Sequence, residues 1–196
     1  MLKRIFDLIT SFISLLFIFP ILFLVSIIIK ISSPGPVFYK QVRVGRNNKD
    51  FSIFKFRTMH LNADKKGLLT VGGRDPRVTA IGYYLRKSKL DELPQLINVL
   101  KGDMSFVGPR PEVRQYVKLY NSQQQKVLDV KPGITDLASI EFRNENEILS
   151  KQKDPNQYYI DYIMPKKIEI NLKYINQRSL LKDLDVIFKT FIAILR

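Results

Sequence analysis

Two adjacent carboxylates, Asp91 and Glu92, precede a proline in the stretch LDELPQLINVL (90–100). Proline is tolerated in the first turn of a helix, so the sequence predicts a helix from about Pro94 to Leu100 with both acids at its N-terminal rim. Neighbouring side chains point in different directions in a helix or a strand, which excludes a pair of facing carboxylates that share one proton. The two acids therefore have separate roles, in chemistry or as plain helix-terminal charges.

Cationic side chains occur where they could meet an anion. In the stretch FSIFKFRT (51–58), Lys55 and Arg57 are two residues apart, and in a β-strand this spacing puts both on one face, within reach of the same anion. Arg110 lies between two prolines in GPRP (108–111), and their fixed φ angles make it a rigid arm. Such an arginine binds a phosphate, stacks on a base, or pairs with a nearby carboxylate within a turn.

The composition favours a phosphate-binding protein and excludes several kinds of site. The chain has 196 residues and a net charge of +14, which attracts the phosphates of nucleotides, nucleic acids or anionic lipids. It contains no cysteine and one histidine, His60, which we expect to be structural. Disulfides, thiolate or His-rich metal sites and a cysteine nucleophile are therefore excluded.

The elements that position these residues begin with an apolar N-terminal segment. The 22 residues from Leu8 to Ile29 carry no charge, and as a helix they extend about 33 Å, enough to cross a hydrocarbon core of roughly 30 Å. Basic residues lie on both sides of the segment, so the positive-inside rule places both flanks in the cytoplasm. Pro20, in the middle, bends a helix. Two interpretations remain: a helix that dips into the membrane and returns to the same face, and a mildly kinked transmembrane anchor.

The cluster SSPGP (32–36) ends this helix and separates a membrane segment, 1–31, from one further domain, 32–196. Strand signals on both sides of a turn predict a β-hairpin, and helices are expected further along the chain. The strands are expected at 37–44 and 51–58, and the helices at 81–90, 94–100, 112–130, 156–176 and 180–195. The last helix has an apolar face that either packs in the core or lies on a membrane. The expected fold class is α+β, mainly α.

Together these motifs resemble those of the bacterial sugar transferase family, the monotopic polyprenyl-phosphate phosphoglycosyl transferases. The resemblance rests on the apolar segment with its central proline, SPGPVFY (33–39), FKFRTM (54–59), DPR (75–77), RKSKLDELPQ (86–95) and VGPRP (107–111). It covers nearly the whole chain, whose size is that of the minimal members. The resemblance implies a re-entrant membrane helix, amphipathic interfacial helices, and a catalytic domain on the cytoplasmic face of the bacterial inner membrane.

The resemblance also implies a reaction, in which a sugar 1-phosphate moves from a UDP-sugar to undecaprenyl phosphate with Mg²⁺ and UMP is released. Asp91 matches the family nucleophile, which forms a covalent phospho-sugar intermediate, and is the expected metal ligand; Glu92 matches an essential glutamate. Four residues match basic positions around the nucleotide and phosphates: Lys55, Arg57, Arg86 and Arg110. The expected partners are the two substrates and membrane lipid, without nucleic acid; a homodimer is left open.

The sequence departs from the family pattern in two places. Phe19 replaces the serine before the central proline, which removes a side-chain hydrogen bond that would support the bend. The family stretch PGITGWAQ reads PGITDLAS at 132–139, which leaves the identity of the sugar open.

Two other classes of protein remain as alternatives. A membrane-anchored basic module that binds nucleic acid or anionic lipid predicts salt-dependent binding without magnesium-dependent release of UMP. A purely structural anchor for polysaccharide assembly leaves the Asp-Glu and Pro-Arg-Pro motifs unexplained.

Overall fold

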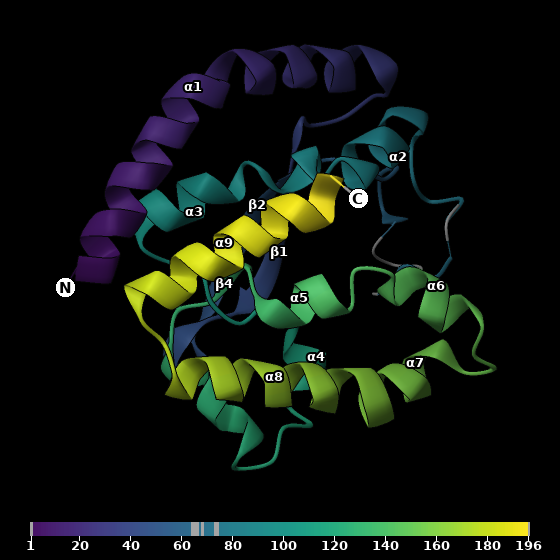
Figure 1. Ribbon diagram of the computed structural model, residues 1–196. Helices are drawn as coiled ribbons and strands as arrows, with labels where there is room; N and C mark the ends of the chain where they lie inside the picture. The colour runs from purple at the N-terminus through teal and green to yellow at the C-terminus, as the bar shows by residue number, and fades with distance from the viewer. Residues whose placement is uncertain (1, 64–66, 68, 73–74, 196) are drawn as a thin grey trace.

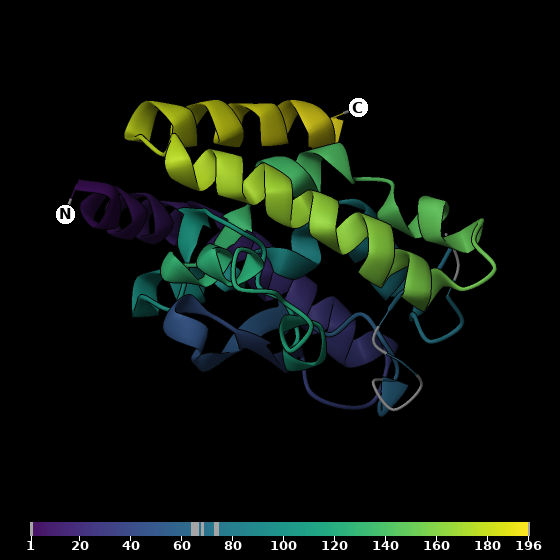
Figure 2. The ribbon, with the colours of Figure 1, turned by 90° about the horizontal axis from the view of Figure 1, so that it is seen from below.

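The computed structural model describes residues 2–63, 67, 69–72 and 75–195, and it confirms the mainly helical α+β class (Figure 1). The helices are α1 (Leu2–Ser32), α2 (Ala80–Lys87), α3 (Gln95–Lys101), α4 (Arg114–Val117), α5 (Leu137–Glu141), α6 (Glu145–Ser150), α7 (Pro155–Tyr158), α8 (Met164–Asn176) and α9 (Leu180–Leu195). The strands are β1 (Phe38–Val44), β2 (Asp50–Phe56), β3 (Ser105–Val107) and β4 (Gly133–Thr135). Seen from below, α8 and α9 lie on one side of the molecule and the β1–β2 hairpin on the other (Figure 2).

Helix α1 bends about midway along its length and arches over the rest of the chain (Figure 1). Pro20 lies inside it, and a proline both removes a backbone hydrogen bond and clashes with the preceding turn, which kinks a helix. Within the described part of the chain, α1 is the one helix long and apolar enough to cross a membrane, by length and composition.

The first turns of α1 are tied to the domain by polar contacts. Arg4 donates from Nη1 to the carbonyl oxygen of Val99 (2.5 Å) and from Nη2 to that of Leu100 (2.9 Å), at the C-terminal end of α3. Carbonyls at this end of a helix lack intrahelical partners, so a cation there stabilises α3. Asp7, which is buried, accepts the backbone N–H of Phe106 at 3.2 Å.

The last turns of α1 pack on the same domain. Val25 and Ile29 are buried in a cluster with Phe56 of β2 and Leu85 of α2. Both ends of the bent helix therefore contact one folded unit, which a straight helix across a membrane would not allow.

The predicted β-hairpin is confirmed, because β1 pairs antiparallel with β2 over the whole length of both strands. The buried side chain of Asn98, on α3, extends this hydrogen-bond ladder. Its Oδ1 accepts the N–H of Phe54 at 2.9 Å, and its Nδ2 donates to the carbonyl oxygen of Ser52 at 2.8 Å. This side chain fixes α3 against the strand that carries Lys55.

A parallel pairing of β3 with β4 was not foreseen from the sequence. Gly108, directly after β3, and Gly133, in β4, are in close backbone contact. A Cβ on Gly133 would lie 2.1 Å from the backbone nitrogen of Gly108. Gly133 also donates its N–H to the carbonyl oxygen of Pro109 at 3.1 Å. The start of the Pro-Arg-Pro segment is thereby held against β4.

The helix expected at 112–130 is wrong for most of its length. The structure has α4 and then a 3-10 helix at Gln124–Asp129. Between them Asn121 and Gln124 form a capping box, in which each side chain accepts the other residue's backbone N–H at 2.9 Å. A capping box starts a new helical segment, so it divides the polar stretch that the sequence predicted as one helix. The helices expected at 81–90, 94–100, 156–176 and 180–195 are confirmed, with the third interrupted by a π-helical segment, Tyr159–Ile163.

Replacing Gly82 with alanine is expected to destabilise the protein. Gly→Ala inside a helix ordinarily stabilises by about 0.5–1 kcal/mol, but a Cβ on Gly82 would lie 2.1 Å from the carbonyl oxygen of Thr58. We expect a net loss of about 1–3 kcal/mol as α2 is pushed away. Thermal unfolding in detergent, followed by circular dichroism at 222 nm, measures this change. Lys87→Ala, on an exposed position of the same helix, is the control; equal stability of the two variants would contradict the close contact.

Candidate active site

A cavity of about 450 Å³ brings together all six residues that the sequence indicated as site residues: Lys55, Arg57, Arg86, Asp91, Glu92 and Arg110. They come from β2 and the segment after it, from α2, from the 3-10 segment Leu90–Glu92, and from the segment after β3. These elements are far apart in the sequence, and the cavity therefore depends on their tertiary packing.

Glu92 forms ion pairs with two of the cations. Lys55 donates to its Oε1 at 3.0 Å, and Arg110 binds both carboxylate oxygens, with Nη1 3.0 Å from Oε2 and Nη2 on Oε1. Burial raises the pKa of Glu92, but the charges of Arg110 and Lys55 outweigh this effect and hold that pKa well below its usual range. Glu92 therefore stays ionised and fixes the directions of both cations.

Asp91 differs from its neighbour, although the two are adjacent. It is buried, and its Oδ1 has no hydrogen-bond partner among the described residues. Burial and the charge of Glu92 raise the pKa of Asp91. An unpartnered buried acceptor costs folding free energy, and such a group in a cavity is typical of a reactive site.

Asp91 does not lie in the first turn of α3, the helix at whose N-terminal rim the sequence placed it. Asp91 belongs to the 3-10 segment Leu90–Glu92, whereas α3 begins at Gln95. Pro94 occupies the N-cap position of α3 without a side-chain capping bond.

Arg86 reaches the cavity from the last turn of α2. Its Nε donates to Thr58 Oγ1 at 2.9 Å and its Nη1 to Thr70 Oγ1 at 3.2 Å. Burial lowers the pKa of Arg86, while the charge of Asp91 acts in the opposite direction. The arginine remains a cation, and the two hydroxyl groups hold it beside Asp91.

Arg57 does not act together with Lys55 on one group. It donates from Nε, Nη1 and Nη2 to the carbonyl oxygens of Pro36 (2.6 Å), Pro34 (2.7 Å) and Ser33 (2.9 Å). Strand β2 ends at Phe56, so the alternation that suggested a shared anion does not extend to Arg57. Arg57 holds the segment that leaves α1, and its role in substrate binding stays a prediction.

The cavity also has polar lining residues that the sequence reasoning missed, among them Arg43, Glu112 and Tyr159. Glu112 directly follows the Pro-Arg-Pro motif, which is the one signal that could have indicated it. Arg43 lies in a stretch that reads as an ordinary strand, and nothing in the sequence there indicates a site residue. Tyr159 reaches the cavity from the π-helical segment.

The site suits a magnesium ion that arrives with phosphate oxygens. Within the described ranges no group of three or more His, Cys, Asp and Glu side chains could hold a metal. Of the two motif carboxylates, Glu92 is engaged by cations, whereas Asp91 has one oxygen with no partner in the described part of the chain. Mg²⁺ commonly takes one or two protein carboxylates and completes its shell with substrate phosphates and water. The residues therefore fit Mg²⁺ at Asp91 together with a diphosphate.

Comparison with known proteins places this site in a family. Residues 1–196 match the family described as bacterial sugar transferase. The chain is 38% identical, over 97% of its length, to the UDP-glucose:undecaprenyl-phosphate glucose-1-phosphate transferase of Escherichia coli. It is 37% identical, over 98%, to the UDP-N-acetylgalactosamine-undecaprenyl-phosphate N-acetylgalactosaminephosphotransferase of Aeromonas hydrophila. It is 40% identical, over 96%, to an uncharacterized sugar transferase of Bacillus subtilis, EpsL.

The chain spans 39% of the Escherichia coli protein, 43% of the Aeromonas protein and 85% of EpsL. The part that it shares with all three contains the whole cavity described above. The match over the full chain, together with these identities, shows that the chain belongs to the bacterial sugar transferase family.

Proposed function

We propose that the chain transfers a sugar 1-phosphate from a UDP-sugar to undecaprenyl phosphate at the cytoplasmic surface of the bacterial inner membrane, through a covalent aspartyl intermediate. One observation carries this proposal. In a single cavity, Asp91 keeps a carboxylate oxygen that no described residue partners, while Glu92, beside it, is held by Lys55 and Arg110. The names of the Escherichia coli and Aeromonas hydrophila relatives give a UDP-sugar and undecaprenyl phosphate as their substrates. A module that only binds nucleic acid or lipid would not require this arrangement.

In the first step, Asp91 attacks the β-phosphorus of the donor, the phosphorus that carries the sugar. A P–O bond to Asp91 forms as the bond from that phosphorus to the bridging oxygen breaks, and UMP leaves with the bridging oxygen. A carboxylate that approaches a diphosphate meets negative charge, so Lys55, Arg86 and Arg110 are needed to lower the repulsion and stabilise the leaving phosphate.

In the second step, a phosphate oxygen of the lipid acceptor attacks the same phosphorus. The bond to Asp91 breaks, the carboxylate is restored, and the sugar leaves on a lipid diphosphate. The covalent intermediate lets a soluble donor and a membrane-bound acceptor use the same site in turn. Because its pKa is held low, Glu92 is a poor proton acceptor at neutral pH, and we assign it the role of orienting Lys55 and Arg110.

A bound Mg²⁺ would supply further neutralisation of the phosphate oxygens. The residue proposed to hold it is Asp91, with the remaining ligands from substrate and water.

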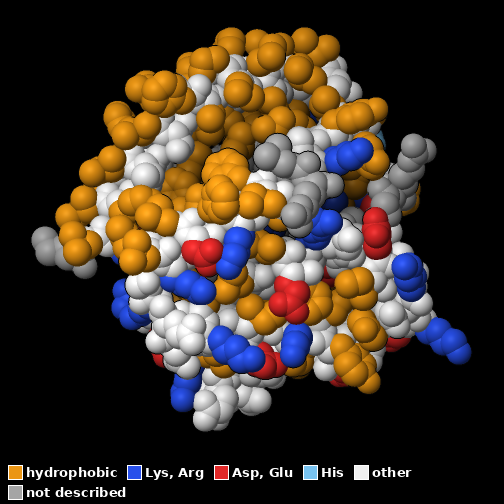
Figure 3. Space-filling model, in the orientation of Figure 1, with side chains coloured by type: hydrophobic (Ala, Val, Ile, Leu, Met, Phe, Trp, Pro, Cys, Tyr) orange, Lys and Arg blue, Asp and Glu red, His pale blue; other side chains and the backbone are white. Residues whose placement is uncertain are grey.

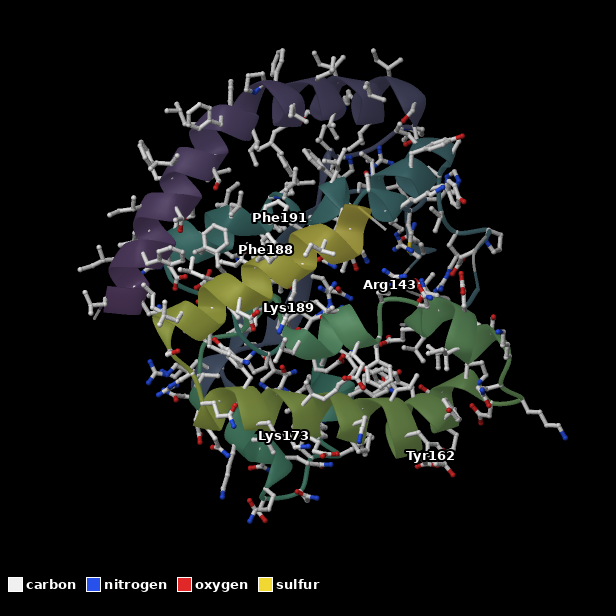
Figure 4. All side chains as sticks on the ribbon, viewed as in Figure 1. Arg143, Tyr162, Lys173, Phe188, Lys189 and Phe191 are labelled. Carbon is white, nitrogen blue, oxygen red and sulfur yellow. The ribbon has the colours of Figure 1, made fainter. Side chains whose placement is uncertain are left out.

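Two apolar surfaces on one face of the molecule support the proposed membrane placement. Hydrophobic side chains gather over α1 and α9 in Figure 3, and charged side chains gather below them. Phe188 and Phe191 lie on the side of α9 toward α1, whereas Lys189 lies on the other side (Figure 4). The core-packing interpretation of this face is wrong, since Phe188 is 65% and Phe191 63% exposed. We propose that α1 enters the bilayer as a re-entrant helix and that α9 lies on its surface.

Asp91→Asn is expected to lower UMP release by about 10³-fold or more, because the amide cannot act as a nucleophile. The measurement is the release of UMP from a panel of UDP-sugars by detergent-solubilised protein with Mg²⁺ and undecaprenyl phosphate. Asp129→Asn, at an exposed carboxylate, is the matched control and should keep wild-type activity. Turnover by Asp91→Asn near the wild-type rate would exclude Asp91 as the nucleophile.

Removal of divalent cations with EDTA is expected to stop UMP release in the wild-type protein, and excess Mg²⁺ is expected to restore it. The reason is the repulsion between Asp91 and the donor phosphates, which the protein cations reduce only in part. Circular dichroism with and without EDTA should show no change in helix content. Full activity in EDTA would contradict a role for a metal ion.

Single cysteines test the re-entrant placement, because the chain has none of its own. We expect cysteines at Leu2→Cys and Ser32→Cys to react with a membrane-impermeant maleimide in inverted membrane vesicles and not in intact spheroplasts. A spanning helix would expose one of the two positions to the outside. Labelling of either variant in intact spheroplasts would therefore reject the re-entrant helix.

A further inference from the structure

The cavity contains a second polar cluster, which the phosphate chemistry does not use. Its centre is Glu112, whose Oε1 accepts the hydroxyl of Tyr159 at 2.7 Å and whose Oε2 accepts the N–H of Val113 at 2.9 Å. Nη1 of Arg43 lies 3.9 Å from the same Oε2. A carboxylate oxygen accepts about two hydrogen bonds, so each oxygen of Glu112 keeps capacity for a further donor.

This cluster is held rigidly by the fold. Arg43 donates to the carbonyl oxygen of Pro111 at 3.0 Å, and Val44 donates its N–H to the carbonyl oxygen of Glu112 at 2.9 Å. Two bonds from β1 therefore fix the backbone on which Glu112 stands. The guanidinium of Arg43 is also within electrostatic reach of both Glu112 and Arg110.

The tyrosine comes from an uncommon backbone conformation. Tyr159 begins the π-helical segment Tyr159–Ile163. Short π-helical segments inside α-helices are rare and are found frequently at functional sites. Its ring is buried and packs on that of Tyr116, with 4.9 Å between the centroids. Burial, with the charge of Glu112, raises the pKa of Tyr159 well above its usual range. Tyr159 is therefore a neutral donor that orients Glu112 at physiological pH.

The chemistry around Glu112 differs from the chemistry around Asp91, although both line the same cavity. Lys55, Arg86 and Arg110 suit phosphates, whereas Glu112 repels them. A neutral group with several hydroxyls suits Glu112, because two neighbouring hydroxyls can each donate to one carboxylate oxygen. Ser139, from the stretch at 132–139 that departs from the family pattern, lines the same cavity.

We propose that Glu112, oriented by Tyr159 and Arg43, binds hydroxyl groups of the donor sugar and helps to decide which UDP-sugar the enzyme uses. The inference rests on the proposed function, since it assigns the residues around Glu112 to the sugar and those around Asp91 to the diphosphate. Glu112 contacts the substrate, whereas Tyr159 and Arg43 act as positioning residues.

The test compares Glu112→Gln with Glu147→Gln, a matched change at an exposed glutamate that does not line the cavity. The substrates are UDP-glucose, UDP-galactose and UDP-N-acetylgalactosamine, and UMP serves as a competitive probe of the nucleotide end. For Glu112→Gln we expect KM for the preferred UDP-sugar to rise about tenfold or more, with a changed preference among the sugars and a Ki for UMP within twofold of the wild type. Glu147→Gln should change none of these values.

Tyr159→Phe keeps the buried ring and removes only the hydroxyl, so it provides a second variant if Glu112→Gln unfolds. It should shift KM for the sugar in the same direction by a smaller factor and leave Ki for UMP unchanged. An equal rise in KM and in Ki for UMP would place the nucleotide at Glu112 and overturn the inference. Unchanged kinetics in both variants would also overturn it.

Failure of this inference and failure of the proposed function give different results. If the wild-type protein releases no UMP from any UDP-sugar, the proposed function fails and the sugar site fails with it. If the wild-type protein is active and Glu112→Gln cannot be distinguished from it, only the sugar site fails.

Discussion

The ion pairs of Glu92 with Lys55 and Arg110 are the interaction on which the site depends. They join β2, the 3-10 segment Leu90–Glu92 and the segment after β3 through one largely buried carboxylate, 14% exposed. A buried charge without a partner is strongly destabilising, so removing Glu92 would leave both Lys55 and Arg110 without their counter-charge. Since both oxygens of Glu92 are engaged, Asp91 remains the motif carboxylate with an available oxygen. One pairing thus orients the cations and distinguishes the two adjacent acids.

Backbone contacts hold the partners of Glu92 where this pairing requires them. Arg110 follows Gly108, which crosses Gly133 so closely that neither position has room for a side chain. Lys55 stands on β2, which is fixed to α3 by the amide of Asn98. Hydrogen bonds of this kind restrict each element to one position, and this preorganisation of fixed charges is what transition-state stabilisation requires.

The membrane helix is part of this same structure and not a separate tether. Arg4 at one end of α1 caps α3, and Ile29 at the other end packs beside β2 and α2. Elements that carry Lys55 and Arg86 are therefore joined directly to the helix proposed to enter the bilayer. In the proposed reaction the acceptor phosphate lies at the membrane surface, so a rigid link between α1 and the cavity keeps the site at the depth of that phosphate.

The sequence by itself determined the types of residue available for chemistry and the elements with strong local signals. The turn residues after β1 predicted the hairpin, Pro20 predicted the bend in α1, and the order of the motifs indicated the six residues that the cavity brings together. Each of these signals is local, because the residues that form one turn, one bend or one motif are close together in the chain. The tertiary structure decided the pairing of Glu92, the use of Arg57 on the segment after α1, the parallel pairing of β3 with β4, and the hydrogen bond of Tyr159 to Glu112. Each of these depends on contacts between segments far apart in sequence, whose partners no local spacing specifies.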